Sequence, residues 1–258
     1  LANLESVKYN KNYSFIHGDI CDAKVVKKAM NGVDQVVHFA AESHVDRSIE
    51  NSDVFIKTNV EGTRVLLDTA RDAGHIRFHH VSTDEVFGAL KKGDHKFDEK
   101  TPYDPRSPYS AAKASSDHLV RAYYHTHNLP VTISNCSNNY GAYQFPEKFI
   151  PTMIIGLIQG KKIPLYGDGS NIRDWIHIRD HNKGVEKIIK EGKAGETYCL
   201  GGNSEKGNVE VAKMVLKEFN QGEDMIEFVE DRKGHDWRYA IDFSKAKNEL
   251  DWQPQIDF

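Results

Sequence analysis

Two spacings of apolar residues alternate along the first part of the chain, one typical of strands and the other of helices. The runs SFIHGDI at 14–20 and VDQVVHFA at 33–40 are too short for helices and predict strands. Between them, Asp22 is a suitable N-cap for a helix through residues 23–30, and Gly32 ends that helix. This stretch therefore predicts the order strand, helix, strand.

The same order continues toward the middle of the chain. A polar turn at 41–49 precedes apolar positions at helical spacing over 52–73, and IRFHHVS at 76–82 predicts the next strand. A helix over 108–127 and a strand over 130–137 follow. Strands and helices that alternate in this way form a parallel sheet with right-handed crossovers. The sequence thus predicts an α/β fold with a doubly wound parallel Rossmann-type sheet.

Beyond Tyr140 the predicted elements become shorter and less regular. They comprise helices near 149–160, 183–191 and 208–219 and strand-like runs at 174–180, 197–202 and 226–232. These segments indicate a smaller α/β unit that is interleaved with the first. We assign residues 1–140 and about 172–192 to the larger domain, and about 141–171 and 193–258 to the smaller one.

Composition narrows the range of partners. The chain of 258 residues has 39% hydrophobic residues, enough for a sizeable core, and its net charge of −4 comes from interspersed acids and bases. This pattern argues against a nucleic-acid or membrane-surface partner. Cys21, Cys136 and Cys199 lie far apart and in no metal-binding pattern, so we expect no metal site and a reducing, cytoplasmic location. No apolar run approaches the ~20 residues that cross a bilayer.

Tyr109 and Lys113 are the first candidates for chemistry. In open parallel sheets, ligands bind beyond the carboxyl ends of the strands. The two residues are four apart on the predicted helix 108–127, so their side chains lie on one face. An exposed amphipathic pair would have the same spacing, but the small residues of YSAAKAS let a cofactor approach closely. A neighbouring ammonium favours the phenolate and lowers the pKa of a tyrosine, which suits a general base.

Thr83, Asp84 and Glu85 directly follow the predicted strand 76–82. A strand-ending turn would also use Thr and Asp, and this is the better reading of the triplet alone. With Tyr109 entering the same crevice from the next helix, a catalytic site becomes the better interpretation. The triplet then supplies a hydroxyl donor beside two carboxyls whose environments can push their pKa values apart.

Five segments carry a resemblance to a known family. They are VSTDEVFG, SPYSAAKASSDHLV, SNNYGAYQFPEKFIP, PLYGDGSNIRDW and DRKGHDWRYAID, in this order. Together they resemble dTDP-glucose 4,6-dehydratases of the extended short-chain dehydrogenase/reductase superfamily, over essentially the whole chain. The Tyr-x-x-x-Lys pair is shared by the superfamily. The Thr-Asp-Glu triplet is more specific, because related epimerases and decarboxylases usually carry other residues at one or both carboxylate positions.

The resemblance implies a lyase mechanism with an internal redox loop. Tyr109, assisted by Lys113, would remove the proton of the sugar 4-OH while hydride leaves C4 for NAD, and Thr83 would hydrogen-bond the developing ketone. Glu85 would then remove the acidic C5 proton as a protonated Asp84 donates to the departing C6 hydroxyl. Return of the hydride to C6 yields dTDP-4-keto-6-deoxyglucose, an intermediate of deoxysugar and rhamnose formation, and regenerates NAD.

The same resemblance implies which residues bind the two ligands. Along NAD it places, besides Tyr109 and Lys113, the residues Asp19, Ile20, Ala40, Ala41, Glu42, Ser43, Thr58 and Asn139. Around the nucleotide sugar it places, besides Thr83, the residues His44, Asn138, Lys148, Phe149, Pro164, Leu165, Tyr166, Arg173, Asn208, Arg232 and His235. Arginine suits the diphosphate because its guanidinium makes bidentate contacts, although a solvated arginine is the alternative at each position.

The sequence also departs from the family pattern. The family binds the cofactor pyrophosphate with a Gly-rich turn after its first strand, and no G-x-x-G-x-x-G occurs here. The strand order 3-2-1-4-5-6 would place two further strands between 14–20 and 33–40. Relatives also continue beyond WQPQIDF into a C-terminal helix. We therefore expect a fragment of a longer protein, and loss of NAD binding if those strands are truly absent.

Other functions stay open at this stage. A UDP-sugar dehydratase, an epimerase or a decarboxylase of the same superfamily is the nearest alternative, since residue types do not reveal the choice between thymine and uracil. A non-catalytic dinucleotide-binding scaffold is an alternative of another class, but such a protein would not require all five candidate catalytic residues. The superfamily resemblance also implies a homodimer formed through helices 52–73 and 108–127.

Overall fold

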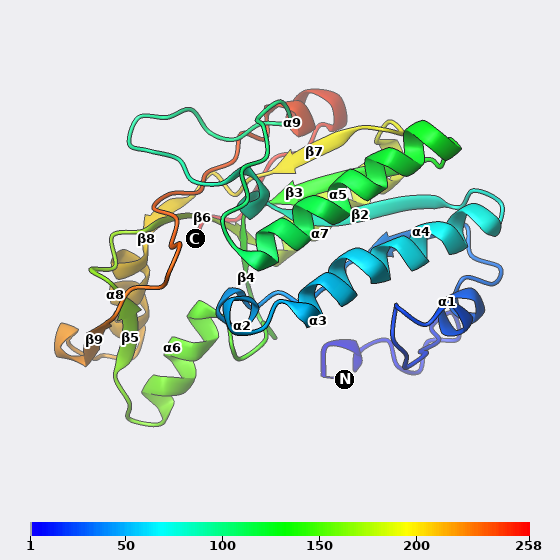
Figure 1. Cartoon of the computed structure of the whole chain (residues 1–258). Coiled ribbons are helices and arrows are strands. Elements are labelled where there is room, and N and C mark those ends of the chain that lie inside the picture. The colour runs from blue at the N-terminus through cyan, green and yellow to red at the C-terminus, as the bar shows by residue number, and fades with distance from the viewer. Residues whose placement is uncertain (1) are drawn as a thin grey trace.

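The protein is described by a computed structural model that covers residues 2–258. Its largest element is a sheet of β1 (Gln35–His38), β2 (Arg77–Thr83), β3 (Val131–Cys136) and β7 (Thr197–Leu200), in that spatial order (Figure 1). Every neighbouring pair in this sheet is parallel. The predicted α/β fold with a parallel Rossmann-type sheet is therefore confirmed.

Helices cover this sheet on its two faces. On one face α4 (Thr63–Asp72) and α5 (Pro108–His127) lie side by side, and α7 (Ile178–Glu191) lies behind the sheet (Figure 1). α1 (Ala23–Ala29) packs against α4, and α9 (Ser244–Leu250) packs against α7. Side chains of a strand point alternately to the two faces, so an inner strand that is buried on both contributes to two cores.

Local sequence signals set the bounds of α5, which match the prediction. Ser107 is its N-cap, and its hydroxyl accepts a hydrogen bond from the backbone N–H of Ser110 at 3.1 Å, while Pro108 occupies the first turn. Asn128 ends the helix in the left-handed region with φ 54°. Because capping depends on neighbouring residues, such bounds are legible from sequence.

The helix predicted over 52–73 is continuous but changes its winding. It consists of α3 (Asp53–Phe55), a π-helical segment at Ile56–Gly62, and α4. Asp22 also caps α1 as predicted, since its carboxylate accepts from the backbone of the first helical turn. A π segment, whose hydrogen bonds span one residue more than those of an α-helix, often marks a functional position.

A smaller unit lies beside the carboxyl ends of β2 and β3 (Figure 1). β6 (Ile172–His177) pairs in parallel with β4 (Asn138–Tyr140) and antiparallel with β8 (Glu205–Gly207). β5 (Ile163–Tyr166) pairs in parallel with β9 (Ile226–Val229). The helices α6 (Phe149–Ile158) and α8 (Asn208–Glu218) and the 3₁₀ turn η4 (Glu223–Met225) complete the unit.

Three predictions of secondary structure are wrong. Residues 14–20 form no strand, because no strand among residues 2–258 lies beside them to accept their backbone hydrogen bonds. The segment 41–49 is not merely a turn but contains α2 (Val45–Glu50), which His44 caps by accepting from Arg47 N. The helix predicted at 183–191 begins at Ile178, directly after β6. A further 3₁₀ turn, η1, spans Ala2–Leu4.

The position of β7 bears on the domain division. β7 lies in the range 193–258 that the sequence assigns to the smaller domain, but it pairs with β3 and is the fourth strand of the large sheet. α9, from the same range, contacts β7 and α7. The backbone thus crosses between the units more often than the sequence indicates.

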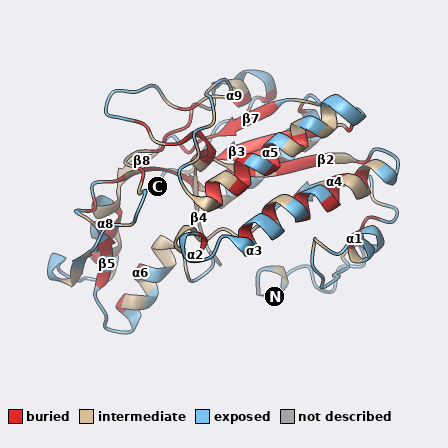
Figure 2. Ribbon diagram, in the orientation of Figure 1, coloured by how far each residue is buried: buried red, intermediate tan, exposed pale blue. Residues whose placement is uncertain are grey.

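The cores of the two units are distinct. Leu67, Phe78 and Val131 are fully enclosed between α4, α5 and the large sheet, whereas Met153 and Leu165 lie in the smaller unit between α6, α8 and β5. In Figure 2 the inner strand β3 and the edge strand β7 are buried along their whole length, and β2 is buried over most of its length. Among the described residues, no helix is both long enough and apolar enough to traverse a lipid bilayer.

Gly202, just after β7, provides a test of this packing. A Cβ there would lie 1.8 Å from the carbonyl oxygen of Trp175 on β6, so Gly202→Ala forces the two segments apart. We expect its free energy of unfolding to fall by about 3 kcal/mol. Gly207→Ala is the matched control, because a Cβ at Gly207 meets no atom within 4 Å, and its change should stay below about 1 kcal/mol. Equal losses in urea unfolding would contradict the close approach.

Candidate active site

The candidate catalytic residues meet at the carboxyl end of β2. Thr83 ends this strand and caps the 3₁₀ turn η3 (Asp84–Phe87), where its hydroxyl oxygen accepts from Glu85 N at 3.3 Å. The first turns of α5 bring Tyr109 and Lys113 to the same end of the sheet. The strand, the turn and the helix therefore unite residues that are far apart in sequence.

Tyr109 is held in place by its own backbone and ring. Its N–H donates to the hydroxyl of Ser48 on α2 at 3.2 Å, and its ring packs edge-on against Phe55. Burial, and then the negative charge of Glu85, raise the pKa of Tyr109 well above its usual value. This is opposite to the lowering expected from the sequence.

The side chain of Lys113 points toward β2, and this contributes to the difference between the expected and the observed pKa change of Tyr109. The side chain is only 4% exposed, and its ammonium donates to the carbonyl oxygen of Val81 at 2.8 Å and lies 3.2 Å from His80 Nε2. Burial lowers the pKa of Lys113 itself. The ammonium is thus engaged with β2, and burial and the nearby Glu85 favour the neutral form of the Tyr109 phenol.

The two carboxyls of the triplet have different surroundings. Asp84 is 2% exposed, and burial, followed by repulsion from Glu85 and Asp174, raises its pKa well above the usual value. Burial also raises the pKa of Glu85, but the guanidinium groups of Arg232 and Arg173 oppose that change. Asp84 is therefore the better proton donor, and Glu85 the better proton acceptor.

A cavity of about 490 Å³ opens in front of Glu85, between the two units. It is lined by all eleven residues that the sequence places around the nucleotide sugar in addition to Thr83. These are His44, Asn138, Lys148, Phe149, Pro164, Leu165, Tyr166, Arg173, Asn208, Arg232 and His235. Thr83 itself does not line the cavity, and its hydroxyl lies 3.3 Å from Asp84 Oδ1.

The cationic groups of this cavity already have partners. Lys148 Nζ donates to the carbonyl oxygen of Ser43 at 2.7 Å, and Arg232 Nε lies 3.8 Å from a carboxylate oxygen of Asp46. The hydroxyl of Tyr166 donates to the other oxygen of Asp46 at 3.0 Å. Residues 43–46 of the large unit therefore hold cations and an aromatic ring of the smaller unit across the cavity.

Arg173 is the most buried of these cations. It is 6% exposed, donates to the carbonyl oxygen of Asp236 at 3.0 Å, and stacks over the ring of Tyr239 at 4.3 Å. His235 lies edge-on to Tyr166 and 2.7 Å from Asp231. Their positions are therefore determined by packing as well as by charge.

Sequence reasoning missed eight residues of the cavity lining. A signal was present for three of them, because Glu147, Trp175 and Tyr239 lie inside the segments that carry the family resemblance. The eight are Val45, Asp46, Glu147, Thr152, Met153, Trp175, Val229 and Tyr239. Residue type alone did not mark them, since acids and apolar groups are not obvious ligands of a diphosphate.

The residues expected along NAD follow β1 and the π-helical segment. Ala40 and Ala41 follow the end of β1 after one intervening residue. Glu42 and Asn59 exchange hydrogen bonds of 2.9 and 3.0 Å that tie this loop to the π-helical segment beside Thr58. Ser43 reaches the cavity.

The other expected NAD residues lie on three further segments. The carboxylate of Asp19 accepts from Cys21 N at 2.8 Å, and Ile20 packs against the large core. Asn139 lies on β4, and its buried Oδ1 has no partner among the described residues. Small side chains at Ala40 and Ala41 and an unpaired amide oxygen fit a dinucleotide. In residues 2–258, no cluster of three or more His, Cys, Asp or Glu is arranged to hold a metal ion.

Comparison with known proteins agrees with this geometry. Residues 1–258 match the family described as GDP-mannose 4,6 dehydratase. The chain is 49% identical over 280 residues to a dTDP-glucose 4,6-dehydratase of Xanthomonas campestris pv. campestris, and the match covers 100% of this chain and 79% of that protein. The enzyme of that name from Escherichia coli is 45% identical over 288 residues, with 100% and 80% covered.

The chain belongs to the dTDP-glucose 4,6-dehydratase family. A dTDP-glucose 4,6-dehydratase of Streptomyces venezuelae, solved with NAD bound, superposes with a TM-score of 0.97 at 47% identity, over 100% of this chain and 79% of that one. A UDP-glucuronic acid 4-epimerase of Bacillus cereus gives a TM-score of 0.93 at only 26% identity, over 99% and 81%. The predicted resemblance to the dehydratase family is confirmed, and the fold extends to epimerases.

The protonated state of Asp84 can be tested through stability. Burial raises the pKa of this carboxyl in the folded protein, whereas the unfolded chain ionises it above about pH 4. Stability is therefore lost as pH rises through the unfolded pKa toward the raised folded pKa. Asp84→Asn removes that loss, so its free energy of unfolding should exceed wild type by about 2 kcal/mol at pH 7, with the gain vanishing near pH 4.

Urea unfolding at a series of pH values measures this gain. Asp34→Asn makes the same chemical change at an exposed position and should show no gain that grows with pH. A gain of equal size at every pH would mean that Asp84→Asn acts through packing, and no gain at all would mean that Asp84 is ionised in the folded protein.

Proposed function

We propose that this protein is a lyase that dehydrates dTDP-glucose to dTDP-4-keto-6-deoxyglucose with NAD as cofactor. The observation that carries the proposal is the triplet Thr83, Asp84 and Glu85 facing Tyr109 and Lys113 beside a cavity lined with cations. An epimerase requires the tyrosine and lysine for oxidation at C4. It does not require an acid and a base to remove water.

Tyr109 acts on the sugar 4-hydroxyl. Its phenolate accepts the proton of that hydroxyl while C4 becomes a carbonyl carbon, and Lys113 stabilises the phenolate by its positive charge. Thr83 turns its hydroxyl from Asp84, to which it donates at 3.3 Å, toward the new carbonyl oxygen. Because the isolated site favours a neutral tyrosine, the ammonium of Lys113 must move closer to the phenol in the substrate complex.

Glu85 and Asp84 then divide the elimination between them. The carboxylate of Glu85 takes the C5 proton, which the C4 carbonyl has made acidic. The electron pair forms the C5=C6 double bond as the C6–O bond breaks, and the proton of Asp84 passes to the departing oxygen, so water leaves. The higher pKa of the enclosed Asp84 and the arginines near Glu85 suit this division of roles.

The cavity offers groups for each part of the nucleotide sugar. Lys148, Arg173 and Arg232 supply positive charge for the diphosphate, and the ring of Tyr166, with Pro164 and Leu165 beside it, offers a surface for the base. His44, Asn138 and Phe149 lie on the sugar side, and Asn208 and His235 line the nucleotide side. These assignments rest on position in the cavity and on chemical type.

NAD, when bound, supplies the acceptor for the C4 hydride and the donor that returns it to C6. Ala40, Ala41, Glu42, Ser43 and Thr58 would lie along it, Asp19 and Ile20 beside its adenine, and Asn139, Tyr109 and Lys113 at the nicotinamide end. The large unit would thus be the NAD-binding domain and the smaller unit the nucleotide-sugar domain, with β7 and α9 joined to the former.

Two further properties belong to the proposal. Homodimerisation would use the helices of 52–73 and 108–127, which lie side by side on an outer face where Val54 and Ile56 are exposed. A cytoplasmic location agrees with Cys21, Cys136 and Cys199, all of which are free thiols. Sedimentation of the purified protein would test the dimer.

Product analysis tests the proposed reaction. The purified protein is incubated with NAD and either dTDP-glucose or UDP-glucose, and the masses of the nucleotide sugars are measured by mass spectrometry. Conversion of dTDP-glucose to a product lighter by one water, with little conversion of UDP-glucose, is expected. A product of unchanged mass would indicate an epimerase. Loss of water from UDP-glucose would indicate a different nucleotide preference, and the absence of any product would indicate a binding protein.

Glu85→Gln separates oxidation from elimination. This substitution keeps the size of the side chain but removes the base, so dTDP-glucose should still reduce bound NAD while formation of the dehydrated sugar falls at least ~100-fold. Absorbance of the reduced nicotinamide follows the first step and mass spectrometry the second. If the two steps fell by the same factor, Glu85 would not be the C5 base.

A further inference from the structure

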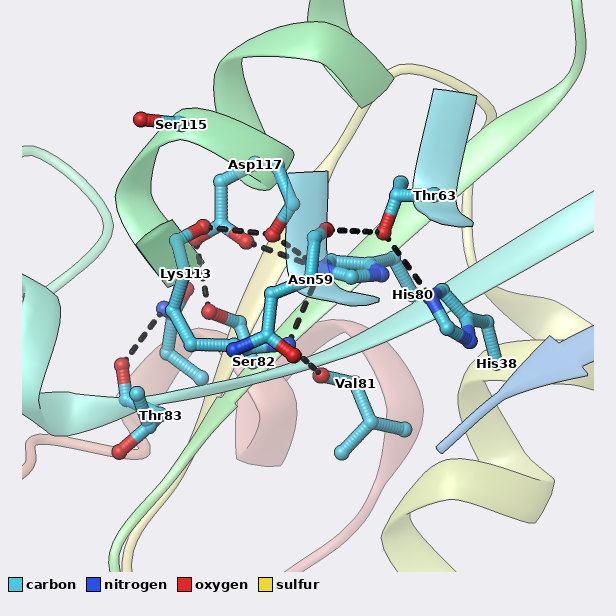
Figure 3. Close-up of polar contacts among 12 residues, drawn as sticks. His38, Asn59, Thr63, His80, Val81, Ser82, Thr83, Lys113, Ser115 and Asp117 are labelled. Atoms are coloured by element: carbon cyan, nitrogen blue, oxygen red, sulfur yellow. Dashed lines mark hydrogen bonds and ion pairs between the residues drawn. The ribbon is translucent and has the colours of Figure 1, made fainter. Parts of the chain in front are cut away.

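A buried group of polar side chains surrounds Lys113 between α5 and β2 (Figure 3). Its centre is Asp117, which is completely buried and sits one helical turn beyond Lys113 on α5. An ionised carboxylate is costly to bury unless hydrogen bonds or opposite charges compensate it. Asp117 has no evident place in the reaction steps described above.

Hydrogen bonds from two other elements hold the carboxylate. Its Oδ2 accepts from the hydroxyl of Ser82 on β2 at 2.8 Å and from the hydroxyl of Tyr103 at 2.7 Å, while its Oδ1 lies 3.2 Å from His80 Nε2. Burial by itself would raise the pKa of Asp117, but the contact with His80, the charge of Lys113 and the hydrogen bond from Tyr103 hold it below the usual value. Asp117 is therefore a buried anion at neutral pH.

Tyr103 connects this anion to a second cation. Its hydroxyl accepts from the guanidinium of Arg121 at 2.8 Å, and that guanidinium also lies over its ring, 4.9 Å from the centroid. The Tyr103 hydroxyl thus donates its hydrogen bond to Asp117, and Arg121 orients that hydroxyl by donating to its oxygen. The carboxylate is fixed in direction from a loop, a strand and a helix.

The same anion lies next to Lys113. His80 Nε2 is 3.2 Å from Lys113 Nζ and 3.2 Å from Asp117 Oδ1, so one imidazole edge separates the two charges. Ser116 adds a contact of 3.2 Å to this nitrogen and donates to the carbonyl oxygen of Lys113 at 2.8 Å. The ammonium of Lys113 and the carboxylate of Asp117 are therefore close enough to attract each other strongly in a buried, low-dielectric setting.

The other titratable groups around Lys113 are neutral. Burial lowers the pKa of His80 to about 4 and that of His38 well below its usual value. Burial also raises the pKa of the Cys136 thiol to about 12 and that of Tyr109 well above its usual value. Among these groups, which come from β1, β2, β3 and α5, Asp117 carries the charge that opposes the desolvation of Lys113.

We propose that Asp117 is a positioning residue for the dehydratase reaction, which keeps Lys113 charged and holds its ammonium against β2, one helical turn from Tyr109. Without this anion, burial would favour a neutral amine, which could no longer stabilise a phenolate. The hydrogen bond to Ser82 serves the same end, because Ser82 immediately precedes Thr83. Asp117 therefore links the helix that carries Tyr109 and Lys113 to the strand that carries the triplet. This inference rests on the proposed function.

Asp117→Asn tests the proposal. The amide can keep the hydrogen bonds from Ser82 and Tyr103 and present its NH₂ to His80, while the charge is lost. Removal of a negative charge makes Lys113 easier to deprotonate, so its pKa should fall by about one unit. In the pH profile of NAD reduction by dTDP-glucose, the alkaline limb, where the rate declines as pH rises, should then lie about one pH unit lower than in the wild type. At pH values above this limb, the rate of the variant should be about tenfold lower than that of the wild type.

Two variants serve as controls. Tyr103→Phe deletes one hydrogen bond to Asp117 but leaves its charge, and it should move the alkaline limb by less than a third of the shift caused by Asp117→Asn. Ser115→Ala changes an exposed hydroxyl on the same helix and should leave the pH profile unchanged. Thermal unfolding of each variant establishes that it is folded at the pH values used.

A direct titration separates this inference from the proposed function. The pKa of Lys113 is measured by NMR with ¹³C-labelled lysine, and Lys113→Met identifies the signal, so no turnover is needed. A fall in this pKa in Asp117→Asn supports the inference even if the wild-type protein leaves dTDP-glucose unchanged, which would reject the function alone. An unchanged Lys113 pKa, or a rate reduced by one factor at every pH, would overturn the role of Asp117.

Discussion

The active site depends on the packing of α5 against the carboxyl end of β2. Ser82 donates to Asp117, and Val81 accepts from Lys113, so two successive residues of the strand are tied to two successive turns of the helix. A shift of one residue in this contact would move Tyr109 away from the triplet. The rest of the site, including the cavity in front of Glu85, is built around this fixed pair of elements.

Burial gives this arrangement its chemical character. The low dielectric that favours a neutral tyrosine and a protonated Asp84 also strengthens the attraction between Asp117 and Lys113. Cations of the smaller unit meet a related constraint, since Arg232 lies near Asp46 and Lys148 is bound to Ser43. A diphosphate that enters the cavity therefore replaces the contacts that these cations make with Asp46 and Ser43, as well as their bound water.

Elements whose signals are local were predicted well. The bounds of α5 follow from Ser107, Pro108 and Asn128, and the start of α1 follows from Asp22, because caps act through nearby backbone groups. Elements that depend on partners distant in the sequence were predicted poorly. Residues 14–20 have the composition of a strand but no neighbour to pair with in the described chain, and β7 joined the large sheet although its surroundings in sequence suggested the smaller unit.

The chemistry divides in the same way. Residue type and order were enough to predict the dehydratase family, the triplet at 83–85, the pair Tyr109 and Lys113, and the lining residues that fall within characteristic motifs. Tertiary structure alone decided which carboxyl is enclosed, that Asp46 and Tyr239 line the cavity, and that Asp117 lies next to Lys113. Protonation and contact follow from burial and from distances between segments remote in the chain, and neither quantity is encoded in local spacing.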